Sequence, residues 1–172
     1  MKPRGAAPKG YEIRELTAAD LGNGFIETLG NLSDTGGLTP ASARRILGKI
    51  GRASIYHVLV AAGADGKVVG ATTLLVEQKF IHGGGLVGHI EDVAVRKASE
   101  GRGIGGSLVK AAVRTADELG CYKVILDCKE ELEPFYAKLG FRKHDLGMRL
   151  DLARPGRKGP ERAATARESS RS

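Results

Sequence analysis

The chain has 172 residues, of which 41% are hydrophobic, and a formal net charge of +7. A chain of this length most simply forms one domain with its own core. The excess positive charge lies at the two ends of the chain. Residues 1–10 hold three basic residues and no acid, and residues 153–172 hold six basic residues and two acids. We therefore expect flexible basic ends on a formally neutral domain over residues 11–152, which argues against nucleic-acid binding as the main function.

No apolar run approaches the roughly 20 residues that a membrane-spanning helix needs, and the first 20 residues lack the apolar centre of a signal peptide. The chain has two cysteines, Cys121 and Cys128, and no cluster of histidines beside them. We therefore expect buried free thiols, no metal site, no membrane contact and a cytoplasmic location.

In chain order, residues 11–17 alternate as a half-buried strand does, and Thr17 resembles the N-cap of a helix that continues to about Leu32. Thr39 and Pro40 are suited to the start of a second, short helix. Three β-branched segments separated by Gly-containing turns then predict consecutive antiparallel strands: 56–63, 67–81 and 87–95.

The second half of the chain predicts four more elements. Apolar residues recur at helical spacing from Leu108 to Leu119, and Gly120 is suited to the helix C-terminus. A buried strand, a short helix and a last strand follow, over residues 121–128, 130–140 and 147–152. This order predicts an α/β (α+β) fold: one domain with a mixed, mostly antiparallel central sheet and helices on both faces.

Residues 101–106, GRGIGG, hold four glycines directly before a predicted helix. Gly101, Gly103 and Gly106 match the dinucleotide pattern G-x-G-x-x-G, with Asp127 about 20 residues later. Five residues separate these glycines from the preceding strand, however, and too little chain follows Asp127 for a doubly wound sheet. A flexible turn is another interpretation. The third is a nest of backbone N–H groups at a helix N-terminus, which suits a pyrophosphate.

The string EGRGIGGSLV resembles the acyl-CoA pyrophosphate loop of the GNAT N-acetyltransferase superfamily, Q/R-x-x-G-x-G/A. Glu100 departs from this pattern, while Gly103 and Gly105 follow it. Because a carboxylate beside a phosphate is unfavourable, we expect Glu100 to face solvent and Arg102 to offset its charge. KFIH, GHIEDVAV, GCYKVILDC, FYAKLGF and ADLGNGFIETLGNLSDTG together resemble the glucosamine-6-phosphate N-acetyltransferase family, in the same order over residues 11–150.

The resemblance implies transfer of acetyl from acetyl-CoA to D-glucosamine 6-phosphate, by direct attack in a ternary complex, for UDP-N-acetylglucosamine biosynthesis. It also implies a splay between two central strands that holds acetyl-CoA, and a homodimer whose C-terminal strands contribute to the partner's site. No Cys or Ser lies in a recognisable nucleophile setting. The alternatives are the same chemistry on another amine (another amino sugar, a polyamine or a protein lysine) and a non-catalytic acyl-CoA-binding module.

The resemblance assigns coenzyme A binding to a strand end and the glycine loop: Val93, Ala94, Val95, Gly101, Arg102, Gly103, Ile104, Gly105 and Gly106. The main chain of residues 93–95 would receive the acetyl carbonyl, although without the resemblance this is an ordinary buried strand. Tyr136 would donate a hydrogen bond to the sulfur of coenzyme A. Its alternative role is aromatic core packing, which fits the neighbouring Phe135 better because a buried hydroxyl needs a partner.

Asp127 and Glu91 complete the implied catalytic set. Asp127 would orient the amine and help to remove its proton, through water or the Glu91 region. Asp127 is also suited to cap the following helix. Glu91 and Asp92 cannot both face one side of the sheet, and together they also fit a solvated strand end.

The resemblance implies a larger set of sugar-phosphate contacts: Ser33, Lys79, Phe80, Ile81, His82, Glu91, Asp92, Val93, Asp127 and Arg149. Without the resemblance, Lys79 is an ordinary solvated charge. The family carries an arginine three residues after the methionine of its last strand, but here that position, counted from Met148, is Asp151. Arg149 shares a strand face with Asp151, so it is the expected phosphate clamp.

Overall fold

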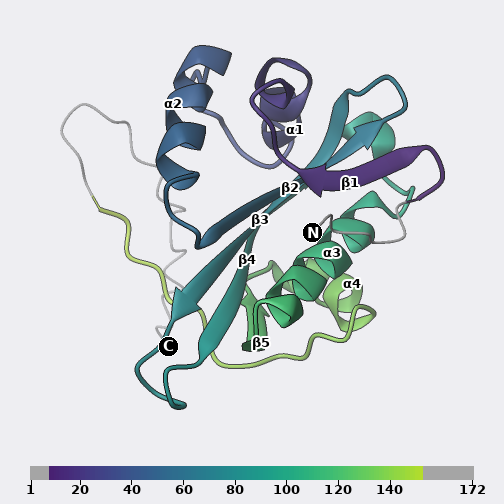
Figure 1. The fold of residues 1–172 in the computed structure, drawn as a ribbon. Coiled ribbons are helices and arrows are strands. Elements are labelled where there is room, and N and C mark those ends of the chain that lie inside the picture. Colours follow the sequence, from purple (N-terminus) through teal and green to yellow (C-terminus); the bar gives the residue numbers. More distant parts are fainter. Residues whose placement is uncertain (1–7, 153–172) are drawn as a thin grey trace, which may run out of the picture.

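The computed structural model describes residues 8–152, so the expectations for residues 1–7 and 153–172 lie outside the described residues. Within residues 8–152, the strands form one sheet in the order β1-β2-β3-β4-β5 (Figure 1). Their bounds are Tyr11–Glu15, Tyr56–Gly63, Val68–Gln78, Leu86–Val95 and Cys121–Leu126. The first four strands are antiparallel and β5 is parallel to β4, which confirms the predicted mixed, mostly antiparallel sheet.

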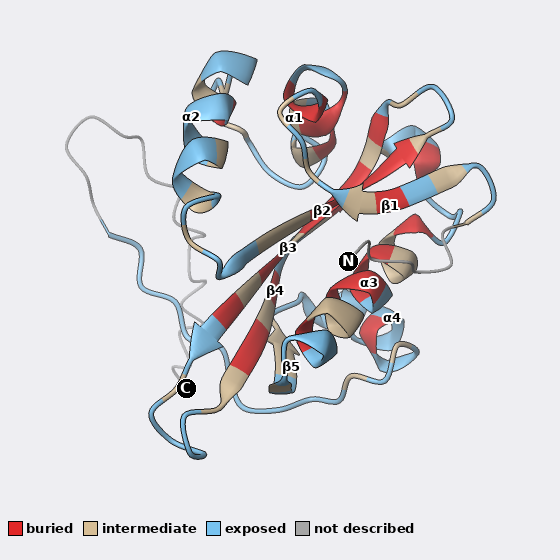
Figure 2. Ribbon diagram, in the orientation of Figure 1, coloured by how far each residue is buried: buried red, intermediate tan, exposed pale blue. Residues whose placement is uncertain are grey.

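Helices cover both faces of the sheet, as predicted (Figure 1). The α-helices are α1 (Phe25–Leu29), α2 (Pro40–Ile50), α3 (Ile104–Glu118) and α4 (Glu133–Ala137), and short 3-10 turns cover Asp20–Gly22, Lys97–Ser99 and Glu130–Leu132. α3 and α4 pack with one core cluster, whereas α1 and α2 pack with the other. The buried residues concentrate in the central strands and on the inner sides of the helices (Figure 2). None of the helices in the described range is long and apolar enough to span a membrane.

Two predicted helix ends are confirmed by their backbone chemistry. Thr39 and Ser42 form a reciprocal capping box at the start of α2, with Pro40 at the first helical position. Gly120 follows α3 with a φ of +82°, which is the left-handed conformation that ends many helices.

The single helix expected from Thr17 to about Leu32 is wrong. The structure has a 3-10 turn at Asp20–Gly22 and the separate helix α1. Gly24 divides them because its φ is +96° and a Cβ there would lie 2.5 Å from the Val68 carbonyl oxygen. Thr17 does not cap a helix through its side chain; its N–H and its hydroxyl both donate to Asp20 at 2.7 Å.

The last strand expected at residues 147–152 is also wrong for the single chain. Residues 142–152 contain no helix or strand. Side chains at every second position are almost fully exposed, with Leu146, Met148 and Leu150 at 89%, 97% and 84%. Apolar residues do alternate with other residues in this segment, but no strand in the described residues pairs with it.

Asp20 anchors the chain between β1 and α1. Its carboxylate is 3% exposed and accepts two 2.7 Å hydrogen bonds from the Arg14 guanidinium. The hydrogen bonds from Arg14 and Thr17 lower the pKa of Asp20 to about 2, against the cost of burial. This carboxylate therefore contributes stability above its ordinary pKa of 3.8, and the contribution is lost as pH falls toward 2.

We expect Asp20→Asn to lower the free energy of unfolding by about 2 kcal/mol at pH 7. Urea unfolding followed by circular dichroism measures this difference. The gap between the two proteins should narrow as pH approaches 2, since the wild-type carboxylate is then protonated as well. Asp117→Asn, on the exposed side of α3, is the control. An equal loss in both variants would contradict the assignment.

Candidate active site

β4 and β5 separate halfway along β4. Their pairing runs from Leu86 opposite Cys121 to Ile90 opposite Leu126, where β5 ends, while β4 continues to Val95. On the other side of β4 the register with β3 shifts, so that two residues of β4 oppose Thr72. Asp92 lies at this bulge with a φ of +53°. Among the described residues, no strand lies beside the Glu91–Val95 part of β4 on the β5 side.

Backbone N–H groups of β4 point into this gap. The N–H of Arg96 donates to the Val69 carbonyl of β3 at 2.8 Å. Because N–H directions alternate along a strand, the N–H groups of Val95 and Val93 point away from β3, and that of Ala94 points toward it. Two of the three residues assigned to the acetyl carbonyl therefore present a donor to the gap.

The glycine loop connects this end of β4 to α3. Gly101 and Gly103 have φ values of +74° and +76°, and a Cβ at either would meet no atom within 4 Å. Gly103 is the N-cap of the 15-residue α3, and Ile104 is buried beneath the first turn. A Cβ at Gly105 would lie 3.5 Å from Val95 Cγ2, so the helix start packs closely on the end of β4. The arrangement places free N–H groups and the positive helix end beside open space, as an anion site requires.

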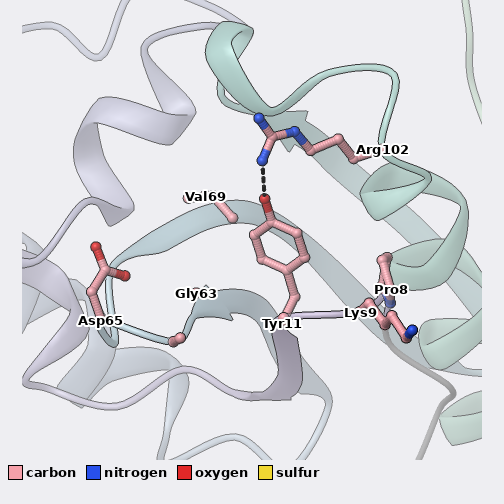
Figure 3. A pocket seen from close by; sticks show the side chains of 9 residues that line it. Pro8, Lys9, Tyr11, Gly63, Asp65, Val69 and Arg102 are labelled. Carbon is pink, nitrogen blue, oxygen red and sulfur yellow. Dashed lines mark hydrogen bonds between the residues drawn. The ribbon is translucent and has the colours of Figure 1, made fainter.

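Two charged residues, Glu100 and Arg102, lie at the start of the glycine loop. Glu100 is exposed, as expected. Arg102 donates from Nη1 to the Tyr11 hydroxyl at 2.9 Å (Figure 3), so its side chain is held against β1 instead of against Glu100. A cavity of about 720 Å³ lies on that side, between the start of β1 and the β2–β3 turn, and includes Lys9 and Asp65. It contains Arg102 but none of the other residues that the resemblance assigned to the site.

Tyr136 lies on α4 and is packed into the core cluster that α3 and α4 share. Its ring is edge-on to Phe135 and Phe141, with centroids 4.9 and 6.0 Å apart, and the residue is 8% exposed. Phe135 is 37% exposed, so the expectation that Phe135 is the buried member of the pair is wrong. Burial, and then the neighbouring Cys128, raise the pKa of Tyr136, which keeps the phenol protonated and able to donate.

Asp127 and Glu91 are brought together by a residue that sequence reasoning missed. His89 Nε2 lies 3.4 Å from Glu91 Oε1 and 3.9 Å from Asp127 Oδ2. Asp127 does not cap the following helix, because the turn begins after Lys129 without a side-chain cap. The position of His89, two residues before Glu91 on one strand, was the available signal.

The residues assigned to the sugar phosphate are spread out in the single chain. Ser33 is exposed in the connection after α1, and residues 79–82 form the β3–β4 hairpin loop, at the opposite end of β4 from the glycine loop (Figure 1). Lys79 Nζ contacts Glu77 at 2.6 Å, and the His82 ring packs against Tyr122. Arg149 is paired with Asp151 through Nε and Nη2 at 2.8 and 2.6 Å.

Both cysteines are free, but the expectation that they are buried is wrong for Cys128, which is exposed, while Cys121 is half-buried. Burial raises the pKa of the Cys121 thiol, which disfavours the thiolate that a nucleophile needs. Within the described residues, no group of three or more metal-ligating side chains is found.

The mostly antiparallel sheet excludes a doubly wound dinucleotide fold, and residues 35–141 match the Acetyltransferase (GNAT) family. The chain belongs to this family. It is 40% identical over 141 residues to the glucosamine 6-phosphate N-acetyltransferase of Trypanosoma brucei brucei, covering 82% of this chain and 95% of that protein. It is also 40% identical over 148 residues to glucosamine 6-phosphate N-acetyltransferase 1 of Oryza sativa subsp. japonica, covering 85% and 90%.

Solved structures agree with this GNAT assignment. The crystal structure of glucosamine-6-phosphate N-acetyltransferase from Arabidopsis thaliana superposes with a TM-score of 0.78 at 33% identity, covering 83% of this chain and 99% of that one. A Trypanosoma brucei acetyltransferase gives a TM-score of 0.76 at 39% identity, with the same coverage. The predicted single GNAT domain is therefore confirmed, and the individual site residues stay predictions.

Proposed function

We propose that this GNAT enzyme transfers acetyl from acetyl-CoA to the amine of D-glucosamine 6-phosphate, by direct attack in a ternary complex. The β4–β5 gap, with the glycine loop at its end, is the observation that carries the proposal. The choice of substrate follows from the names of the relatives given above. The product would serve UDP-N-acetylglucosamine biosynthesis in the cytoplasm.

The residues around the gap suit an acyl-CoA. Open space faces the positive-φ glycines Gly101 and Gly103, so a pyrophosphate can approach the bare backbone at the start of α3. Val93 and Val95 offer N–H groups where a thioester carbonyl develops negative charge during attack. Acetyl-CoA supplies an activated acetyl group and a thiol leaving group. The protonated phenol of Tyr136 is suited to donate to that sulfur.

The carboxylates of Glu91 and Asp127 are suited to bind the amine of the sugar and to accept its proton. A sugar ammonium is attracted to carboxylates and must lose a proton before it attacks. Both carboxylates are on the side of the gap that is open to solvent, with their side chains 49% and 82% exposed. Asp127 therefore orients the amine and accepts its proton directly or through water.

Release of free thiol from acetyl-CoA tests this function. We expect turnover with glucosamine 6-phosphate to exceed that with glucosamine, spermidine or a lysine peptide. Preference for one of the latter would point to another amine. Acetyl-CoA binding by calorimetry without turnover of any amine would favour an acyl-CoA-binding module.

Arg149 is the proposed phosphate clamp, and substitution of Arg149 and of its partner Asp151 tests this role. We expect Arg149→Ala to lower kcat/KM for glucosamine 6-phosphate about 10-fold, as loss of one charge-assisted contact would, with little change for glucosamine. Asp151→Asn removes the charge that pairs with the Arg149 guanidinium, and kcat/KM for glucosamine 6-phosphate is expected to be at least that of wild type. Equal losses on both sugars in Arg149→Ala would remove Arg149 as the clamp.

We also propose a homodimer in which residues 146–152 pair with a second copy. Leu146, Met148, Leu150 and Leu152 recur at every second position and are at least 76% exposed, which is the pattern of a strand with one apolar side and no partner. β5 is the last strand in the sheet order, so its outer edge is open among the described residues. In Figure 1 the segment leaves α4 and extends past β5, away from the sheet.

Truncation tests the dimer. A chain that ends at Asp145 is expected to be a monomer by light scattering, because it lacks the apolar segment. The matched control ends at Leu152, retains the segment and is expected to remain a dimer. A dimeric chain ending at Asp145, or a monomeric full-length chain, would contradict the proposal.

A further inference from the structure

We propose that His89 is a positioning residue that holds the carboxylates of Glu91 and Asp127 at the separation and orientation the amine requires. This inference rests on the proposed acetyl transfer. The sequence resemblance assigned no role to His89, and only the packing of β4 beside β5 reveals it.

The sheet register brings the three side chains together. His89 of β4 lies opposite Ile125 of β5, and the strands are parallel. Moving two residues along each strand leads to Glu91 and Asp127, so both carboxylates share a sheet face with His89. Ile90, between His89 and Glu91, packs in the core beneath α3, which places the three side chains on the opposite face.

The contacts make His89 the common partner of both carboxylates. Nε2 is the imidazole atom nearest to Glu91 Oε1, at 3.4 Å, and to Asp127 Oδ2, at 3.9 Å. Within residues 8–152, neither carboxylate has another ion-pair partner. Two carboxylates that must receive one ammonium repel each other, and the positive N–H edge of an imidazole near both of them reduces that repulsion.

The exposures of the three side chains support a positioning role. The His89 side chain is 24% exposed and its backbone is paired with β3 and β5, whereas the Asp127 side chain is 82% exposed and lies beyond the end of β5. Nothing else in the described residues restrains the Asp127 carboxylate by an ion pair. Because His89 lies inside the sheet and Asp127 lies outside it, His89 is the member of the group that is suited to orient the other two side chains.

His57 provides a matched control. It is also a strand histidine, its side chain is 19% exposed, and its Nδ1 lies 3.3 Å from Glu15 Oε1. His57 alternates with Val58, which packs on the α1 and α2 side, so it faces the α3 side of the sheet. It thus has the same chemistry on the opposite face from the proposed amine site.

The first experiment compares kcat and KM for His89→Leu, His89→Gln and His57→Leu. We expect His89→Leu to lower kcat about 10-fold, the scale of a misplaced catalytic group, with the KM for acetyl-CoA unchanged. His89→Gln retains an N–H donor at the Nε2 position and should recover most of the rate, and His57→Leu should match wild type. A rate in His89→Leu within twofold of wild type, or no recovery in His89→Gln, would overturn the proposal.

The second experiment does not depend on the substrate. Long-range ¹⁵N–¹H spectra of the imidazoles are expected to show the His89 Nε2 signal shifting in both Glu91→Gln and Asp127→Asn, with His57 unchanged. If the His89 Nε2 chemical shift is unchanged in either variant, the proposed contact with both carboxylates is overturned. If wild type turns over no glucosamine 6-phosphate, the proposed function fails, while these spectra still decide whether His89 holds the two carboxylates.

Discussion

Replacing Asp127 by Asn is expected to lower kcat for acetyl transfer about 100-fold, at the low end of what a positioned proton acceptor contributes. The amide has nearly the same shape as the carboxylate but neither attracts the ammonium nor accepts its proton. Since Asp127 is highly exposed, the free energy of unfolding should change little. Steady-state kinetics at saturating acetyl-CoA, together with urea unfolding, measure both quantities.

Asp117→Asn is the control for this substitution, because Asp117 is an exposed aspartate on α3, away from the β4–β5 gap. It should leave kcat unchanged. The KM for acetyl-CoA should also be unchanged in Asp127→Asn, since the glycine loop is intact. A kcat for Asp127→Asn within threefold of wild type would remove Asp127 from the mechanism.

Replacing Tyr136 by Phe is expected to lower kcat by about 10- to 100-fold, because the leaving thiolate loses its donor. The ring that packs against Phe135 and Phe141 is kept, so the thermal midpoint should stay close to that of wild type. The pKa of a tyrosine is ordinarily about 10 and burial raises that of Tyr136 further, so the phenol is a donor throughout the neutral range.

Tyr56→Phe provides the comparison, since Tyr56 is a 40% exposed tyrosine at the start of β2. Single-turnover kinetics with saturating substrates should show the loss in Tyr136→Phe alone. Unchanged turnover in Tyr136→Phe would mean that Tyr136 contributes only to core packing and not to catalysis.

The elements with strong local signals were predictable from the sequence. Thr39 and Ser42 cap each other's N–H groups at the start of α2, and Pro40 has no N–H to satisfy. The β-branched runs on either side of the turns specify β2, β3 and β4. The turn at the glycine loop was also predictable, since positive φ is needed where the chain turns into α3.

Other features depended on contacts between distant residues. Gly24 breaks the expected helix because its backbone packs against Val68, which lies on another strand. Residues 147–152 alternate as a strand does, yet a strand needs a partner edge, and none in the described chain pairs with them. The choice of Tyr136 over Phe135 as the buried ring likewise follows from how α4 sits on the core.

The sequence by itself determined most of the strands and helices in their order, because these follow from local propensity and periodicity. Its resemblance to the GNAT superfamily indicated the domain and the types of residue expected at the site. Only the tertiary structure decided that β5 ends beside Ile90, that β4 bulges at Asp92 and that His89 lies between Glu91 and Asp127. Strand register and strand ends are set by pairing between segments far apart in the chain, which no local pattern encodes.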